Sequence, residues 1–192
     1  MEIYMTNIIL DRLPTEYKGY LIRTSFRIGI QISLCLQDED YSEEERVLIA
    51  LNLLYGNGMP QDLDVAMEGL NWFISCGNEN KKGSVNDKQL FYWDFDNERI
   101  FSSFLATYGI DLTKEDMHWF KFIAMIGSLN KDCAFNKAIE IRDYDMKDLS
   151  GKNRIAMQKM KNALTPERKL RQEEQEALDE FNALFDGGDV NG

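Results

Sequence analysis

The residue types that most often support catalysis or metal binding are sparse in this chain. His118 is the only histidine, and no paired-cysteine or His-Glu-x-x-His pattern accompanies it, which excludes zinc sites that need two histidines. Gly56-Asn57-Gly58 has the glycines of a phosphate loop, but no Gly-Lys-Ser/Thr follows and no buried strand precedes it. We therefore expect His118 to be a helix residue at the edge of a core, and Gly56-Asn57-Gly58 to be an interhelix turn.

Acidic residues are numerous enough to suggest an acid/base pair or a calcium loop by density alone. Asp94 and Asp96 are close in sequence, but their position favours solvated carboxylates at a helix start, where negative charge complements the helix dipole. The acidic stretch 38–45 lacks the alternating ligands, central glycine and terminal glutamate of a calcium loop. Because no nucleophile, base and orienting group can be assembled, the sequence predicts no enzyme, no cofactor and no metal site.

The composition of the whole chain narrows the function further. A chain of 192 residues suits one domain, or one domain with an appendage. Its 33 acidic and 22 basic residues give a net charge of −11, which repels nucleic acid rather than collecting it. The three separated cysteines are typical of reduced thiols in a cytosolic protein. Nowhere do eighteen apolar residues follow one another, so we expect no membrane span.

Local signals divide the first half of the chain into a hairpin and short helices. The segment 7–23 predicts a small hairpin with its turn near Lys18-Gly19. Thr24 is expected to cap a helix that ends near Asp38. Ser42 and Glu45 have the spacing of a capping box, and Gly56 is placed to close that helix. A further helix is predicted from Pro60 and Asp62 to Gly77, with Gly69 weakening the prediction.

The second half repeats the pattern. Asp96 is expected to cap a helix that Gly109 ends, and Thr113 to cap the next helix. Two more helices are predicted at 132–142 and 148–164, and Thr165-Pro166-Glu167 is a start signal for a terminal one.

These elements predict a mostly α protein: a multi-helix bundle of short amphipathic helices with a small N-terminal β-hairpin and a C-terminal helical arm. The predicted division is a helical domain at 1–145, with an internal boundary at the polar linker 77–88, and a charged helical arm at 146–192.

Two features suggest protein binding. The aromatic cluster that includes Trp93 and Trp119 is expected to be mostly core, although part of it could form an exposed binding patch. The arm combines a basic block at 146–164 with an acidic one at 167–189, which is typical either of solvated faces or of an arm that pairs with a partner. The candidate partner-binding residues are Trp93, Trp119, Leu170, Leu178, Phe181 and Phe185.

The stretch Phe95–Leu129, FDNERIFSSFLATYGIDLTKEDMHWFKFIAMIGSL, resembles the phage gene-product-fifteen family. The shared elements are Tyr108 to Leu112, His118-Trp119 and Phe122, and the segment Tyr17 to Arg27 is similar to the family's hairpin and first helix. The agreement runs from about residue 14 to about residue 145. The family often has a second tryptophan where this chain has Phe120, and we find no match after Leu149.

The resemblance implies a gene product of tailed phages and prophages of Gram-positive hosts, usually encoded between the major tail protein and the tape-measure protein. It implies a tail assembly chaperone or morphogenesis factor that binds the tape-measure or tail-tube protein in the host bacterial cytoplasm, with self-association as a further expectation. A structural head-to-tail connector or tail completion protein is the alternative. A helical DNA-binding regulator is disfavoured by the net charge of −11.

Overall fold

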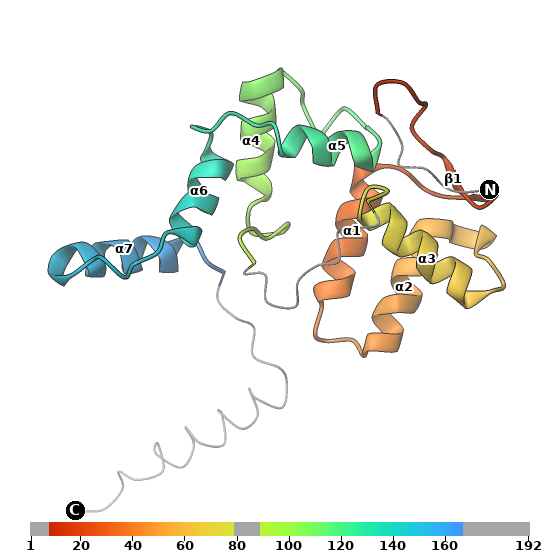
Figure 1. The fold of residues 1–192 in the computed structure, drawn as a ribbon, viewed down its shortest axis with the longest axis horizontal. Helices are drawn as coiled ribbons and strands as arrows, with labels where there is room; N and C mark the ends of the chain where they lie inside the picture. The colour runs from red at the N-terminus through yellow and green to blue at the C-terminus, as the bar shows by residue number, and fades with distance from the viewer. Residues whose placement is uncertain (1–7, 79–88, 167–192) are drawn as a thin grey trace, which may run out of the picture.

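The computed structural model describes residues 8–78 and 89–166, and these residues are mainly helical, as predicted. Figure 1 shows α1, α2 and α3 grouped on one side, α5 reaching toward them, and α6 and α7 at the other side. The elements are β1 (Glu16–Tyr17), β2 (Tyr20–Leu21), α1 (Phe26–Gln37), α2 (Glu43–Tyr55), the 3₁₀ turn η1 (Gly56–Gly58), α3 (Leu63–Ile74), α4 (Asn97–Tyr108), α5 (Trp119–Ile126), α6 (Ala134–Asp143) and α7 (Gly151–Ala163).

The predicted hairpin is confirmed. Strands β1 and β2 pair antiparallel, with Tyr17 opposite Tyr20. Lys18 and Gly19 both have positive φ, at 48° and 86°, which is the geometry of a two-residue type I′ turn. The hairpin holds Tyr17 against α3 at Gly69, where an added Cβ would lie 2.0 Å from the Tyr55 hydroxyl. Glycine at 69 therefore permits close packing between helices, which explains why a poor helix former occupies this position.

The ends of α1 and α2 lie at the predicted residues, except that the N-cap of α1 is one residue later than predicted. The Ser42–Glu45 capping box is present at the start of α2, and Asp38 ends α1. The cap of α1 is Ser25 rather than Thr24, and the Ser25 hydroxyl accepts from the Arg27 N–H at 3.2 Å. Thr24 is engaged elsewhere, since its carbonyl accepts from the Trp119 N–H at 2.7 Å. The long-range contact displaces the local cap by one residue.

Helices α3 and α4 begin next to the predicted residues, and α4 ends where predicted, whereas α3 ends at Ile74, three residues before the predicted Gly77. Asp62 caps α3 by accepting from the Asp64 N–H, and the chain turns at Gly77 with a φ of 76°. Asp96 directly precedes α4, but its side chain makes no capping hydrogen bond, so the predicted cap is wrong. Gly109 ends α4 in the left-handed conformation with a φ of 68°. Glycine is favoured there because that region penalises any Cβ.

The predicted start of α5 at Thr113 is wrong, because the helix begins only at Trp119. The Asp111 carboxylate accepts both the Thr113 N–H and the Thr113 hydroxyl, which forms a turn instead of a helix start. Hydrogen bonds from Thr113 and Lys114 lower the pKa of Asp111 to about 2. Arg27 then ties this loop to α1 by donating to the Leu112 carbonyl at 2.7 Å.

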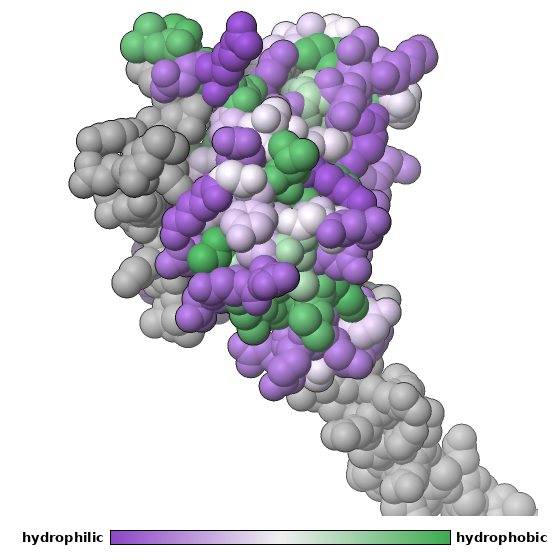
Figure 2. Space-filling view, turned by 90° about the vertical axis from the view of Figure 1, so that its right-hand side faces the viewer, coloured by the Kyte–Doolittle hydropathy of each residue, from purple (hydrophilic) through white to green (hydrophobic). Residues whose placement is uncertain are grey.

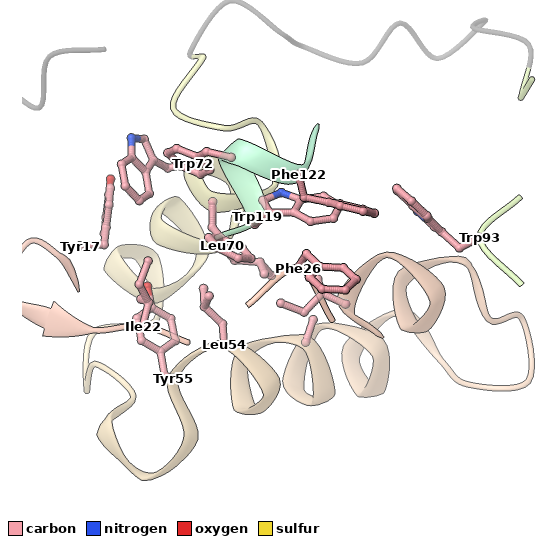
Figure 3. Close-up of a cluster of buried hydrophobic side chains, with 14 of the residues drawn as sticks. Tyr17, Ile22, Phe26, Leu54, Tyr55, Leu70, Trp72, Trp93, Trp119 and Phe122 are labelled. Atoms are coloured by element: carbon pink, nitrogen blue, oxygen red, sulfur yellow. The ribbon is translucent and has the colours of Figure 1, made fainter. Parts of the chain in front are cut away.

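One hydrophobic core contains residues from both sides of 79–88. Phe26 of α1 packs against Phe122 of α5 with tilted rings whose centroids are 4.5 Å apart, and Trp72 of α3 meets Phe120 of α5 edge-on. Figure 3 shows the rings of Phe26, Trp72 and Phe122 in one cluster with Leu54 and Leu70. Most of the predicted linker lies outside the described residues, and the chain before and after it shares this core.

Candidate protein-binding surface

The two tryptophans proposed from the sequence as partner-binding residues lie in the core. Trp119 is 2% exposed and Trp93 is 7% exposed, and their ring centroids are 5.8 Å apart. Trp119 also lies over Gly29 of α1, where an added Cβ would be 2.2 Å from the indole. The binding-patch interpretation of Trp93 and Trp119 is therefore corrected: burial makes both rings packing residues. Leu170, Leu178, Phe181 and Phe185 lie outside the described residues.

His118 caps α5 and contacts the N-terminal segment. Its Nδ1 accepts from the Phe120 N–H at 3.1 Å, so the imidazole is the N-cap of α5. Its Nε2 lies 2.8 Å from the Pro14 carbonyl oxygen, and this pair of contacts fits a neutral ring that donates from Nε2. Burial lowers the pKa of His118, opposed by the hydrogen bond to Pro14. The histidine predicted to lie at the edge of the core thus joins the N-terminal segment to α5.

The expectation that Asp96 is solvated is also wrong. Asp96 is fully buried and forms a bidentate ion pair with Arg142 of α6, with oxygen–nitrogen distances of 2.6 and 2.8 Å. Arg99 donates to the same carboxylate at 3.0 Å, and so does the Tyr92 N–H. These partners compensate the cost of burying the charge. The sequence showed only an acid before a helix, because its partner is 46 residues away.

The same arginine fixes the position of α7. Arg142 Nε donates to the Leu164 carbonyl at the end of α7 at 2.6 Å. Lys161 of α7 donates one hydrogen bond to the Arg142 carbonyl at 3.1 Å and another to the carbonyl of Tyr144. A buried ion pair and helix-end carbonyls therefore hold α7 against α6, where Figure 1 shows it far from α1–α3.

Helix α7 differs from the other α-helices of the described residues because none of its side chains is buried. Met157, Lys161 and Leu164 are the less exposed positions on and just after it. At 100° per residue these three share the side that contacts α6. The opposite side carries only exposed residues, which are Lys152, Ile155, Ala156, Lys159, Asn162 and Ala163. We call this set the α7 stripe.

The α7 stripe combines positive charge with apolar surface. Ile155 is 59% exposed, and Lys152 and Lys159 lie about one turn before and after it. Helix α7 has four basic and no acidic residues, in a chain whose net charge is −11. A basic helix with an exposed isoleucine on a packed, acidic protein suits contact with a partner of opposite charge.

Two other parts of the surface are weaker candidates for a binding site than the α7 stripe. Figure 2 views the face on the α3 side, where hydrophilic side chains surround separate hydrophobic groups. A hollow of about 580 Å³ beside the start of α4 is lined by Asp94, Phe95, Asn97, Glu98, Arg99 and Ser102. Within residues 8–78 and 89–166 no group of three potential metal ligands occurs. Over the same residues, every helix is too short or too polar to cross a bilayer.

Comparison with known proteins places the chain in a phage family. The family described as "Bacteriophage Gp15 protein" matches residues 9–165. Neither the curated proteins nor the solved structures contain a match. The match covers the hairpin, the core and α7, so the expectation that the resemblance ends near Leu149 is wrong. The chain belongs to the Bacteriophage Gp15 family, as the resemblance implied.

Proposed function

We propose that this phage protein is a tail assembly chaperone or related morphogenesis factor, which binds the tape-measure or tail-tube protein through the arm 146–192. The observation that carries the proposal is the exposure of α7. A helix without buried side chains is held in place by a buried arginine, so its outward side is available for a partner. Membership of a bacteriophage family supports a phage protein as that partner.

The chemistry of the α7 stripe agrees with a helical partner. An amphipathic helix can lie along another helix and bury the apolar residues of both. Ile155 would supply the apolar contact, and Lys152 and Lys159 would select acidic residues at its margins. The acidic remainder of the protein would keep a complex with an apolar chain soluble. The proposed action is therefore stoichiometric binding without catalysis, in the host bacterial cytoplasm where tails assemble.

Co-expression with the tape-measure protein of the same phage tests the proposal. The intact protein should raise the soluble fraction of the tape measure and co-purify with it. Ile155→Asp should abolish both effects without changing the fold. The matched control is Leu48→Asp, since Leu48 of α2 is 56% exposed, close to the 59% of Ile155, but lies on a different helix. An equal loss in both variants, or in neither, would contradict binding through α7.

The same system distinguishes the alternative head-to-tail connector or completion protein. A chaperone should be absent from purified virions or present only in traces. Retention in virions at the copy number of a ring would overturn the chaperone proposal in favour of the connector.

A further inference from the structure

The chain that follows α6 runs away from the end of that helix and then returns to it. Helix α6 ends at Asp143, and the end of α7 lies beside it, since Arg142 Nε donates to the Leu164 carbonyl at 2.6 Å. The 13 residues of α7 span about 20 Å, and residues 144–150 cover that distance in the opposite direction. Figure 1 shows α7 returning toward the end of α6. We call residues 144–164 the α7 unit.

Two helix ends of the same polarity therefore meet at the neck of the α7 unit, which consists of Arg142, Lys161 and Leu164. The carboxyl end of a helix carries about half a negative charge on carbonyls without a partner in the helix. Lys161 of α7 donates to the carbonyls of Arg142 and Tyr144 at the end of α6. Arg142 in turn donates to the carbonyl of Leu164 at the end of α7. Each helix thus supplies the cation that stabilises the end of the other.

Apolar packing does not join the α7 unit to the core. Among residues 8–78 and 89–166, neither the core cluster nor the partly buried residues packed against it include a residue of the α7 unit. No side chain of α7 itself is buried. The hydrogen bonds at the neck are therefore the main attachment of the α7 unit to α6. A segment with few buried apolar contacts opens at a lower free energy than the core does.

From this arrangement we infer that the α7 unit opens at its neck as a separate unit while the core remains folded. Lys161 is the positioning residue of the closed state, because Arg142 is also fixed to the buried carboxylate of Asp96. Released α7 is a helix of 13 residues, which is marginal in water without packing, so its amides exchange faster in the open state.

The opening has a consequence for binding. Closure preorganises α7 for a partner, because a helix that is already held in place loses less conformational freedom on binding. Opening does not cover the α7 stripe. The inference does not rest on the proposed chaperone function, and its tests need no phage partner, so the two proposals can fail separately.

Native-state hydrogen exchange of the full chain at low denaturant concentrations tests the separate opening. Exchange of the wild-type amides of α7 should depend little on denaturant, because opening the neck exposes little surface. Exchange of the α5 amides should show the steep dependence of global unfolding, since α5 is buried in the core. An equally steep dependence in α7 would overturn the inference, because α7 would then open only when the core unfolds.

Substitution at the neck tests the role of Lys161. Lys161→Met removes the donor and should speed exchange of the α7 amides on the order of tenfold, without changing α5 exchange. Lys159→Met is the matched control, because it removes the same charge from the exposed side of the same helix, and lysine and methionine have similar helix propensities. It should leave α7 exchange at the wild-type rate.

The conservative variant Lys161→Arg keeps a charged donor at the neck and should keep α7 exchange slow. Equal acceleration in Lys161→Met and Lys159→Met, or acceleration in neither, would overturn the assignment of Lys161. Acceleration of α5 together with α7 in Lys161→Met would overturn the separate opening.

Discussion

Helices α5 and α7 are both short, and they are held in the protein by opposite means. Helix α5 has 8 residues and buries Trp119, Phe120 and Phe122 between α1, α3 and α4. Helix α7 has 13 residues and buries none, yet hydrogen bonds from Arg142 and Lys161 fix its end to α6. The contrast shows that length does not decide which helix supports the fold. Apolar packing anchors α5, whereas polar contacts position α7 and leave its outer side uncovered.

Removing the central indole should give the largest effect. Trp119→Ala empties a buried aromatic site that contacts Gly29, Phe73 and Phe122. We expect the free energy of unfolding to fall by about 3–5 kcal/mol, measured by chemical denaturation. Trp119→Phe is the control and should cost less, because it keeps a ring and removes an indole N–H that has no hydrogen-bond partner among the described residues. An unchanged midpoint for Trp119→Ala would show that the ring does not support the core.

Breaking the buried ion pair should come next. Arg142→Ala leaves the Asp96 carboxylate buried with Arg99 as its remaining charged partner. We expect a loss of about 3 kcal/mol, at the low end for a broken buried pair because Arg99 stays. Exchange of the α7 amides should rise more than that of α5, since Arg142 also holds the Leu164 carbonyl. An equal rise in amide exchange in α5 and α7 would contradict the claim that Arg142 holds α7 in place.

The cap of α5 should give a smaller, pH-dependent effect. The folded-state pKa of His118 is lowered below its ordinary value of 6.5, so the unfolded chain binds the proton more readily. The stability contributed by neutral His118 is therefore complete above pH 6.5 and is lost as pH falls from there through the folded-state pKa. Protonation also removes the Nδ1 acceptor from the Phe120 N–H.

Thermal melts of the wild type and of His118→Asn across this pH range test whether titration of His118 changes the stability. Asparagine can still cap the helix but does not titrate, so its melting temperature should change less with pH than that of the wild type. His118→Ala should cost about 1 kcal/mol at neutral pH through loss of the cap. If the melting temperatures of the wild type and His118→Asn changed with pH in parallel, titration of His118 would not account for the pH dependence of stability.

Deleting residues 165–192 should have the smallest effect on the fold. Among residues 8–78 and 89–166, the core cluster includes no residue of α7 and neither Thr165 nor Pro166. We therefore expect the shortened chain to keep a single cooperative thermal transition but to lose tape-measure rescue in co-expression. A molten or insoluble product would instead assign the segment to the core.

The sequence correctly predicted those parts of the fold that depend on contacts between residues close together in the chain. The Lys18-Gly19 turn, the Ser42–Glu45 capping box and the Gly109 helix end each depend on residues within a few positions, and all three were confirmed. Asp111 also acts locally, but its turn with Thr113 was not recognised, and α5 starts six residues after Thr113.

The candidate site was harder to predict because its determinants are distant in sequence. Burial of Asp96 depends on Arg142, and burial of Trp119 depends on Gly29. Residue spacing along the first helix does not show that the Trp119 ring lies over Gly29. Helix α7 was predicted with its basic charge, whereas the absence of buried side chains on it depends on the arrangement of α6 and α7 in space.

The central claim is that the packed core supports the protein while the arm binds the partner. Hydrogen exchange of the full chain, alone and with the tape-measure protein, tests it most directly. The account predicts that binding protects peptides within 146–192 and leaves α5 exchange unchanged, because α5 is already buried. Protection confined to α1–α5, with none in 146–192, would contradict the account.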